Sequence, residues 1–181
     1  AVVRSIWNYH VNTLGWADIG YNYLISWRGY IFDGRAEYSN YSKDVRGTHD
    51  GYNTGSMGIS AIGDYHTAGK DSPTEALLNA IADIFAWKAK ERNIDPYGKS
   101  YYAGKKAVVE NIYGHRDVSL TSCPGDRLYA KKRNIKDRVY SRLNPTPQPP
   151  AAPSSVSVSF NASGYGGVVS WTAVSDATAY D

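Results

Sequence analysis

Apolar side chains recur at steps of three and four residues in three parts of the chain, which predicts three amphipathic helices. The first helix covers residues 1–14. The second opens at a capping box, residues 72–75, with Pro73 at its first helical position. The third follows Asp126, a suitable N-cap residue, and its apolar positions continue to Leu143.

Short apolar runs between these helices predict strands. Residues 21–27 and 30–33 are typical of a β-hairpin. Residues 57–63 are short and largely apolar, as an inner strand would be, and residues 108–113 predict a strand just before the only cysteine. The remaining polar stretches are expected to be loops: 36–56 and 95–107.

The composition changes sharply after Leu143. Prolines crowd residues 144–155, which predicts a semi-rigid linker. Beyond it, apolar and polar residues alternate at 156–160 and 168–171, as in paired strands, and this short piece cannot bury a core alone. We therefore expect three parts: a domain at 1–143, a linker at 144–155, and the opening strands of a β-sandwich at 156–181.

Composition and charge narrow the class of protein. A hydrophobic content of 42% with 20% charged residues predicts a soluble globular chain, and no apolar run approaches the ~18 residues of a membrane span. The net charge of +3 suits an anionic polymer such as a bacterial wall, but no dense Lys/Arg stripe predicts a nucleic-acid partner. The chain opens on Ala1 inside a predicted helix, so we expect a processed or truncated piece.

The only cysteine, Cys123, follows His115 by eight positions, on the predicted loop between a strand and a helix. A cysteine sulfur and a histidine nitrogen are zinc ligands. The same pair also serves as a nucleophile with its base, because a helix N-terminus lowers a thiol pKa. A buried, inert cysteine beside a hydrogen-bonded histidine is the third interpretation, and spacing alone leaves all three open.

Several blocks, read in order, resemble the peptidoglycan recognition protein family, which includes the type 2 N-acetylmuramoyl-L-alanine amidases of bacteria and phages. The resemblance runs from Ala1 to about Leu143. The blocks are Tyr9-His10, Gly15-Trp16-Ala17-Asp18-Ile19-Gly20-Tyr21-Asn22, Gly34-Arg35, His49-Asp50-Gly51-Tyr52-Asn53, Ser56-Met57-Gly58-Ile59, Gly114-His115-Arg116-Asp117-Val118 and Thr121-Ser122-Cys123-Pro124-Gly125.

The resemblance implies an α/β fold with a mixed, mostly parallel central sheet flanked by helices, and a groove with Zn²⁺ at its floor. His115 and Cys123 match two of the family's three protein ligands. The third, in a His-His-Thr block, would precede Ala1. We therefore expect the 181-residue chain to bind zinc poorly.

The resemblance also implies roles for other residues. Tyr21 matches a tyrosine needed for amidase activity, and its phenol is a neutral donor for an oxyanion. Thr121 would add a weaker hydrogen bond. The substrate-binding residues would be His10, His49 and Asn53, which we expect to face the same cleft as His115 and Cys123.

Three functions follow as hypotheses. The first is a zinc-dependent N-acetylmuramoyl-L-alanine amidase that hydrolyses the lactyl–L-alanine amide bond of peptidoglycan. The second is a non-catalytic peptidoglycan-binding module, and the third is a Cys/His hydrolase without a metal. The segment 156–181 resembles the start of a fibronectin type III module, which together with the single cysteine favours a secreted, monomeric bacterial protein acting at the cell wall.

Overall fold

The computed structural model forms two compact units, residues 1–144 and 145–181. The residues that the structure describes are 1–35, 45–145, 151–160 and 167–174.

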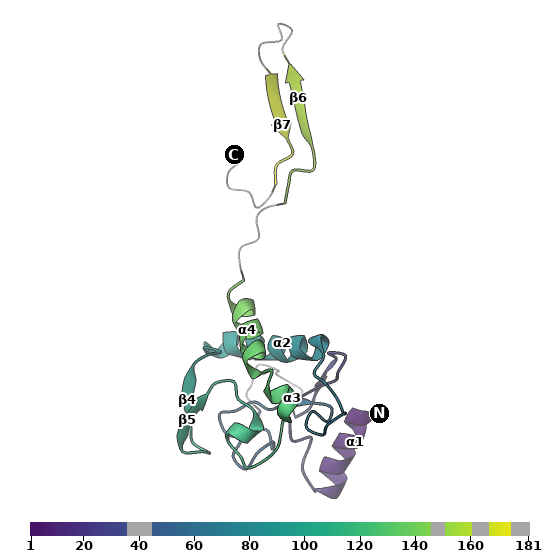
Figure 1. Ribbon diagram of the computed structural model, residues 1–181, viewed down its shortest axis with the longest axis vertical. Helices are drawn as coiled ribbons and strands as arrows, with labels where there is room; N and C mark the ends of the chain where they lie inside the picture. Colours follow the sequence, from purple (N-terminus) through teal and green to yellow (C-terminus); the bar gives the residue numbers. More distant parts are fainter. Residues whose placement is uncertain (36–44, 146–150, 161–166, 175–181) are drawn as a thin grey trace. The chain divides into compact units, whose positions relative to one another are not determined.

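The first unit combines helices with two small sheets (Figure 1). Among the described residues, no helix is both long and apolar enough to cross a membrane. The helices are α1 (Val2–Asn8), α2 (Glu75–Arg92), α3 (Asp126–Tyr129) and α4 (Lys132–Leu143), with a π-helical turn η1 (Tyr9–Thr13) and a 3-10 turn η2 (His115–Asp117). The strands are β1 (Tyr23–Ile25), β2 (Ile31–Asp33), β3 (Ile59–Ala61), β4 (Lys99–Tyr102) and β5 (Ala107–Glu110).

The predicted helix at 1–14 is confirmed as α1 continued by η1, although no residue of either is buried. The second predicted helix is α2, but its start differs from the prediction. Thr74 is the N-cap and its hydroxyl accepts the Leu77 N–H at 3.1 Å, so Pro73 precedes the cap instead of opening the helix. Asn93, in the left-handed conformation, closes α2.

The third predicted helix is two helices, α3 and α4, and its expected N-cap is wrong. Gly125 is the N-cap residue of α3, with φ of 89°, and Asp126 is the first helical residue. The Asp126 carboxylate pairs with the Arg116 guanidinium at 2.6 Å instead of capping the helix. The cap position therefore goes to the glycine, which adopts positive φ without strain.

The predicted hairpin is confirmed by the antiparallel pairing of β1 with β2. The strand predicted at 57–63 is also present, but β3 lies at the edge of the order β2-β1-β3, where it pairs with β1 in parallel. Its apolar residues Ile59 and Ala61 pack against the core cluster. Packing in that cluster thus accounts for the apolar pattern that predicted an inner strand.

Residues 95–107 were expected to be a loop, and this is wrong in part. Lys99–Tyr102 forms β4, which pairs antiparallel with β5 in a separate sheet. The charged and aromatic composition of β4 hid this strand, because only Tyr102 among its residues is buried. The predicted strand at 108–113 ends early, at Glu110. The mixed α/β class is confirmed, and among the described strands only β1 and β3 pair in parallel.

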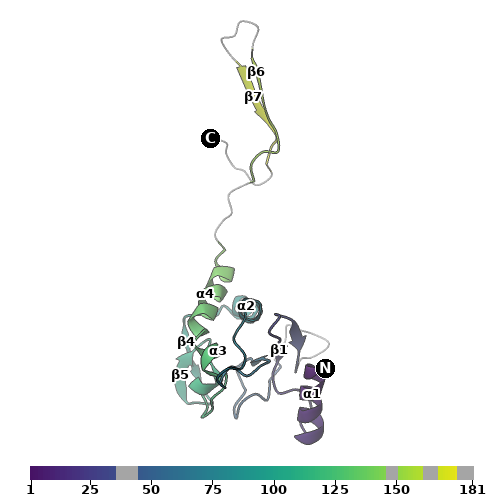
Figure 2. The same cartoon turned by 45° about the vertical axis from the view of Figure 1, so that its right-hand side comes forward.

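The core lies where α4 crosses α2 (Figures 1 and 2). Leu77, Leu78 and Val139 are almost completely buried there. At the rim, Arg138 pairs with Glu75 at 2.6 Å. This helix pair supports the sheet and the loops that carry the site.

The second unit contains β6 (Val156–Phe160) and β7 (Gly167–Trp171), which pair antiparallel as predicted. The register places Val156 opposite Trp171 and Val158 opposite Val169, and all four are exposed. One face of this hairpin is therefore apolar, which is typical of a strand pair that belongs to a larger sandwich.

Candidate functional site

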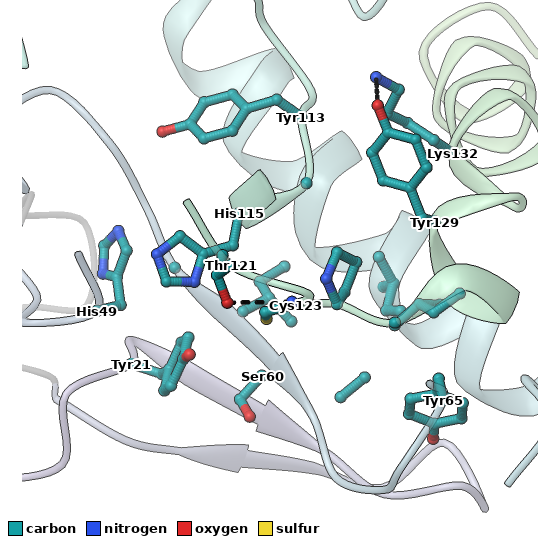
Figure 3. Close-up of a pocket in the computed structure, with 18 of the residues that line it drawn as sticks. Tyr21, His49, Ser60, Tyr65, Tyr113, His115, Thr121, Cys123, Tyr129 and Lys132 are labelled. Atoms are coloured by element: carbon teal, nitrogen blue, oxygen red, sulfur yellow. Dashed lines mark hydrogen bonds between the residues drawn. The ribbon is translucent and has the colours of Figure 1, made fainter. Parts of the chain in front are cut away.

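A pocket of about 470 Å³ lies between β3 and the segment that includes η2 and the loop after it (Figure 3). Five of the seven predicted site residues line it. They are Tyr21, His49, His115, Thr121 and Cys123. These residues come from three separate segments of the chain, and the fold brings them together around one pocket.

His115 and Cys123 are held by a loop that folds back on itself. The Arg116 N–H donates to the Cys123 carbonyl at 3.0 Å, which ties the two ends of the loop together. The Gly114 N–H donates to the Asp117 carboxylate at 2.9 Å and fixes the turn that presents His115. The Cys123 N–H donates to the Thr121 hydroxyl at 3.1 Å. Thr121 therefore contacts the backbone of Cys123, two residues further along the chain.

Tyr21 and His49 form the opposite wall of the pocket (Figure 3). Their rings stack, with centroids 5.9 Å apart and an interplanar angle of 23°. Burial raises the pKa of the Tyr21 phenol, and the neighbouring Cys123 and Asp50 raise it further. Burial also lowers the pKa of His49. Both rings are consequently neutral at pH 7 and act as hydrogen-bonding groups.

The backbone around Tyr21 is braced by Arg35 and Asn22. The Arg35 guanidinium donates to the carbonyls of Ile19 and Asp18 at 2.9 and 2.8 Å, and to the Thr48 hydroxyl at 2.5 Å. The buried Asn22 amide donates to the Val45 carbonyl at 2.8 Å. It also accepts the Gly58 N–H at 2.9 Å. These bonds join the segments on either side of the Tyr21–His49 stack.

His10 and Asn53 do not line this pocket. The His10 ring packs on Trp16 with centroids 4.8 Å apart, and its Nδ1 accepts the Gly20 N–H at 3.3 Å. Asn53 Oδ1 accepts the N–H groups of His49 and Asp50 at 2.8 and 2.9 Å. Asn53 thus shapes the turn that presents His49, and contact of either residue with a substrate stays a prediction.

Asp50 is a pocket residue that the sequence did not single out. Its Oδ1 accepts the Ser119 hydroxyl at 2.5 Å and lies 3.3 Å from His115 Nε2. Burial opposes ionisation of this carboxyl, but hydrogen bonds from Ser119, Gly51 and His115 hold its pKa below the ordinary value. Asp50 is therefore an anion fixed beside a histidine. Only its place next to His49 in the sequence connects it to the site.

The pair of His115 and Cys123 has the donor chemistry of a zinc site. The described residues nevertheless contain no group of three or more His, Cys, Asp or Glu that could hold a metal ion. Burial raises the pKa of the Cys123 thiol, and the nearby Arg116 lowers it in part. The donors fit zinc in kind, and the described part of the chain supplies two of the three that such a centre uses.

The mixed α/β fold and this pocket define a domain that gathers a histidine, a cysteine and a tyrosine around one cavity. The chain belongs to the N-acetylmuramoyl-L-alanine amidase family, whose profile matches residues 4–126.

Two curated relatives show how far the similarity extends. Peptidoglycan-recognition protein SC2 of Drosophila simulans is 33% identical over 132 residues, which is 72% of this chain and 60% of that protein. The human N-acetylmuramoyl-L-alanine amidase is 32% identical over 130 residues, which is 71% of this chain and 19% of that protein. The chain thus spans about 60% of the length of the first relative and a much smaller share of the second.

A solved structure of a tyrosine-to-phenylalanine mutant of Drosophila PGRP-LB, in complex with tracheal cytotoxin, is similar in fold. Its TM-score is 0.54 and its identity 33%, covering 71% of this chain and 64% of that one.

Proposed function

We propose that the first unit binds the muramyl peptide of bacterial peptidoglycan and hydrolyses the amide between the lactyl group of N-acetylmuramic acid and L-alanine. The observation that carries this proposal is the convergence of Tyr21, His115 and Cys123 on one pocket from segments far apart in the chain. Membership of the amidase family supports the reaction. The solved relative in complex with tracheal cytotoxin supports a ligand in this fold.

In this proposal His115 and Cys123 hold Zn²⁺. Bound zinc supplies a Lewis acid that polarises the amide carbonyl and lowers the pKa of a bound water toward ~7. The Tyr21 phenol donates a hydrogen bond to the oxygen on which negative charge develops. Its raised pKa keeps the proton in place at neutral pH. The Thr121 hydroxyl, which already accepts from the Cys123 N–H, adds a second and weaker donor.

The alternative hypothesis of a Cys/His hydrolase without a metal agrees less well with the geometry of the pocket. A histidine base activates a thiol through a hydrogen bond. In the described residues His115 pairs with Asp50, and no hydrogen bond joins its ring to Cys123. Treatment of the chain with a chelator distinguishes the two, because only the Cys/His enzyme would keep its activity without a metal.

A second candidate is peptidoglycan binding without hydrolysis. The incomplete set of metal ligands among the described residues favours it. It uses the same pocket and the same substrate, so it differs from the amidase only in the chemical step.

Release of stem peptide from purified peptidoglycan by the 181-residue chain tests the proposal. We expect hydrolysis that rises with zinc added well above stoichiometric amounts, because two protein donors bind the ion weakly. His115→Ala and Cys123→Ala should abolish it, whereas Asp33→Ala, on the exposed strand β2, should not. Binding of the substrate with no hydrolysis at any zinc concentration would favour the non-catalytic module.

For the second unit we propose the start of a fibronectin type III-like module that follows a Pro-rich linker. The single-sided apolar hairpin of β6 and β7 supports this. With a peptidoglycan substrate, the protein would act as a secreted monomer at the cell wall.

A further inference from the structure

Asp50 makes contacts that no role proposed so far uses. Its side chain is 13% exposed, and that of His115 is 27% exposed. Oδ1 is the acceptor for Ser119, so the carboxylate cannot rotate freely away from the histidine. A partly buried carboxylate that is fixed in this way persists only where its contacts offset its desolvation.

The His115 ring lies between two groups of side chains. Figure 3 shows one ring nitrogen directed toward Thr121 and Cys123 and the other toward the side of His49. Asp50 follows His49 in the chain, and its Oδ1 lies 3.3 Å from Nε2 of His115. Nε2 is therefore the ring nitrogen on the side of His49. Nδ1 is therefore the nitrogen that faces Cys123.

We propose that Asp50 is a positioning residue for His115, accepting the Nε2–H and leaving Nδ1 as a bare lone pair that faces Cys123. A neutral imidazole carries one ring proton, and an ionised carboxylate only accepts. The nitrogen next to Asp50 must then be the protonated one. Metal-ligating histidines commonly donate their other N–H to a carboxylate in this way.

The inference deepens the proposed function, on which the use of Nδ1 as a metal ligand rests. The ring orientation itself is a property of this chain with or without metal. A direct role for Asp50 as a third ligand is less consistent with the geometry. Its Oδ1 lies on the Nε2 side of the ring, and the described residues form no cluster of three ligands.

The test is NMR of the chain labelled with ¹⁵N in its four histidines, with the His115 signals assigned from His115→Gln. We expect the wild-type chain to show His115 protonated at Nε2, with an Nε2–H signal protected from exchange with water. Asp50→Ala should remove this signal and let the Nδ1–H form appear. Ser119→Ala, which removes one hydroxyl, should broaden the signal. Asp33→Ala is the control and should leave it unchanged.

Two results would overturn the inference. One is a wild-type His115 protonated at Nδ1, which needs no variant to fold. The other is an unchanged Nε2–H signal in both Asp50→Ala and Ser119→Ala. The NMR measurement uses neither substrate nor metal. A chain that fails to hydrolyse peptidoglycan would therefore refute the proposed function but leave the assignment of the His115 proton unchanged.

Discussion

The ring and the hydroxyl of Tyr21 have separable roles. The ring stacks on His49, and the hydroxyl is the neutral donor proposed for the oxyanion. Burial raises the pKa of the Tyr21 phenol, so the hydroxyl keeps its proton over the whole neutral range.

Tyr21→Phe keeps the stacked ring and removes only the hydroxyl. Loss of one oxyanion donor lowers the rate of hydrolysis by about 10²–10³-fold. We expect that loss in stem-peptide release at saturating zinc, with binding of a muramyl tripeptide changed only slightly. Equal losses in binding and rate would mean that the hydroxyl binds the ground state instead.

Leu78 and Leu120 are the same residue type at opposite extremes of burial, so they show how burial of one side chain affects stability. Leu78 is 1% exposed in the core, whereas Leu120, on the loop after η2, is fully exposed. Leu78→Ala should lower the free energy of unfolding by about 2–5 kcal/mol, because it removes buried methylene groups and leaves a cavity. Leu120→Ala should change it by less than about 0.5 kcal/mol. Urea denaturation of both variants measures the difference, and similar losses would contradict the burial described.

At the scale of elements, a carboxylate links β5 to α4. Glu110 Oε2 lies 2.8 Å from Lys132 Nζ and 3.0 Å from Lys136 Nζ. Lys132 itself also pairs with Asp117, the last residue of η2. The contact with Lys132, followed by that with Lys136, lowers the pKa of Glu110 below its ordinary value of 4.5. This cluster connects the helix pair to the loop that presents His115.

The pKa of Glu110 predicts how stability depends on pH. Because its folded-state pKa is depressed, the stabilisation is fully present above pH 4.5 and is lost as pH falls through the folded value. We expect Glu110→Gln to have a lower Tm than wild type at pH 7, and the gap to close as the pH falls below 4.5 and through the folded-state pKa. A gap that stays constant down to pH 2 would show that Glu110 acts through packing and not through charge.

Particular residues show what the sequence could predict. Periodicity sufficed for α2, whose buried residues recur on one face, and it also predicted α1, although no residue of α1 is buried. It failed for β4, whose residues are mostly exposed, and for Asp126, whose carboxylate binds Arg116 instead of the helix end. Asp50 and Ser119 meet only through the tertiary fold, so no local pattern could have paired them. His115 and Cys123 were predictable because both stand in one short motif.

At the scale of the whole molecule, the first unit carries the pocket and the second carries a hairpin with one apolar face. In the sequence, the boundary between the two compact units falls after Asn144, close to the composition change after Leu143. The assignment of 144–155 as a linker stays a prediction.

Limited proteolysis tests that linker. We expect the first cuts to fall within residues 144–155 and to release a stable fragment that contains residues 1–143, because a packed core resists cleavage and an exposed connection does not. Early cuts between residues 70 and 140, with 144–155 intact, would contradict this division of the chain.

The most direct test of the central claim is the binding of a muramyl tripeptide to the 181-residue chain, followed by NMR. We predict saturable binding that shifts the signals of Tyr21, His49, His115 and Thr121, which line the pocket, and leaves Arg138 and Arg142 on α4 unchanged. No binding, or shifts confined to the α2–α4 surface, would contradict the assignment of this pocket as the peptidoglycan site.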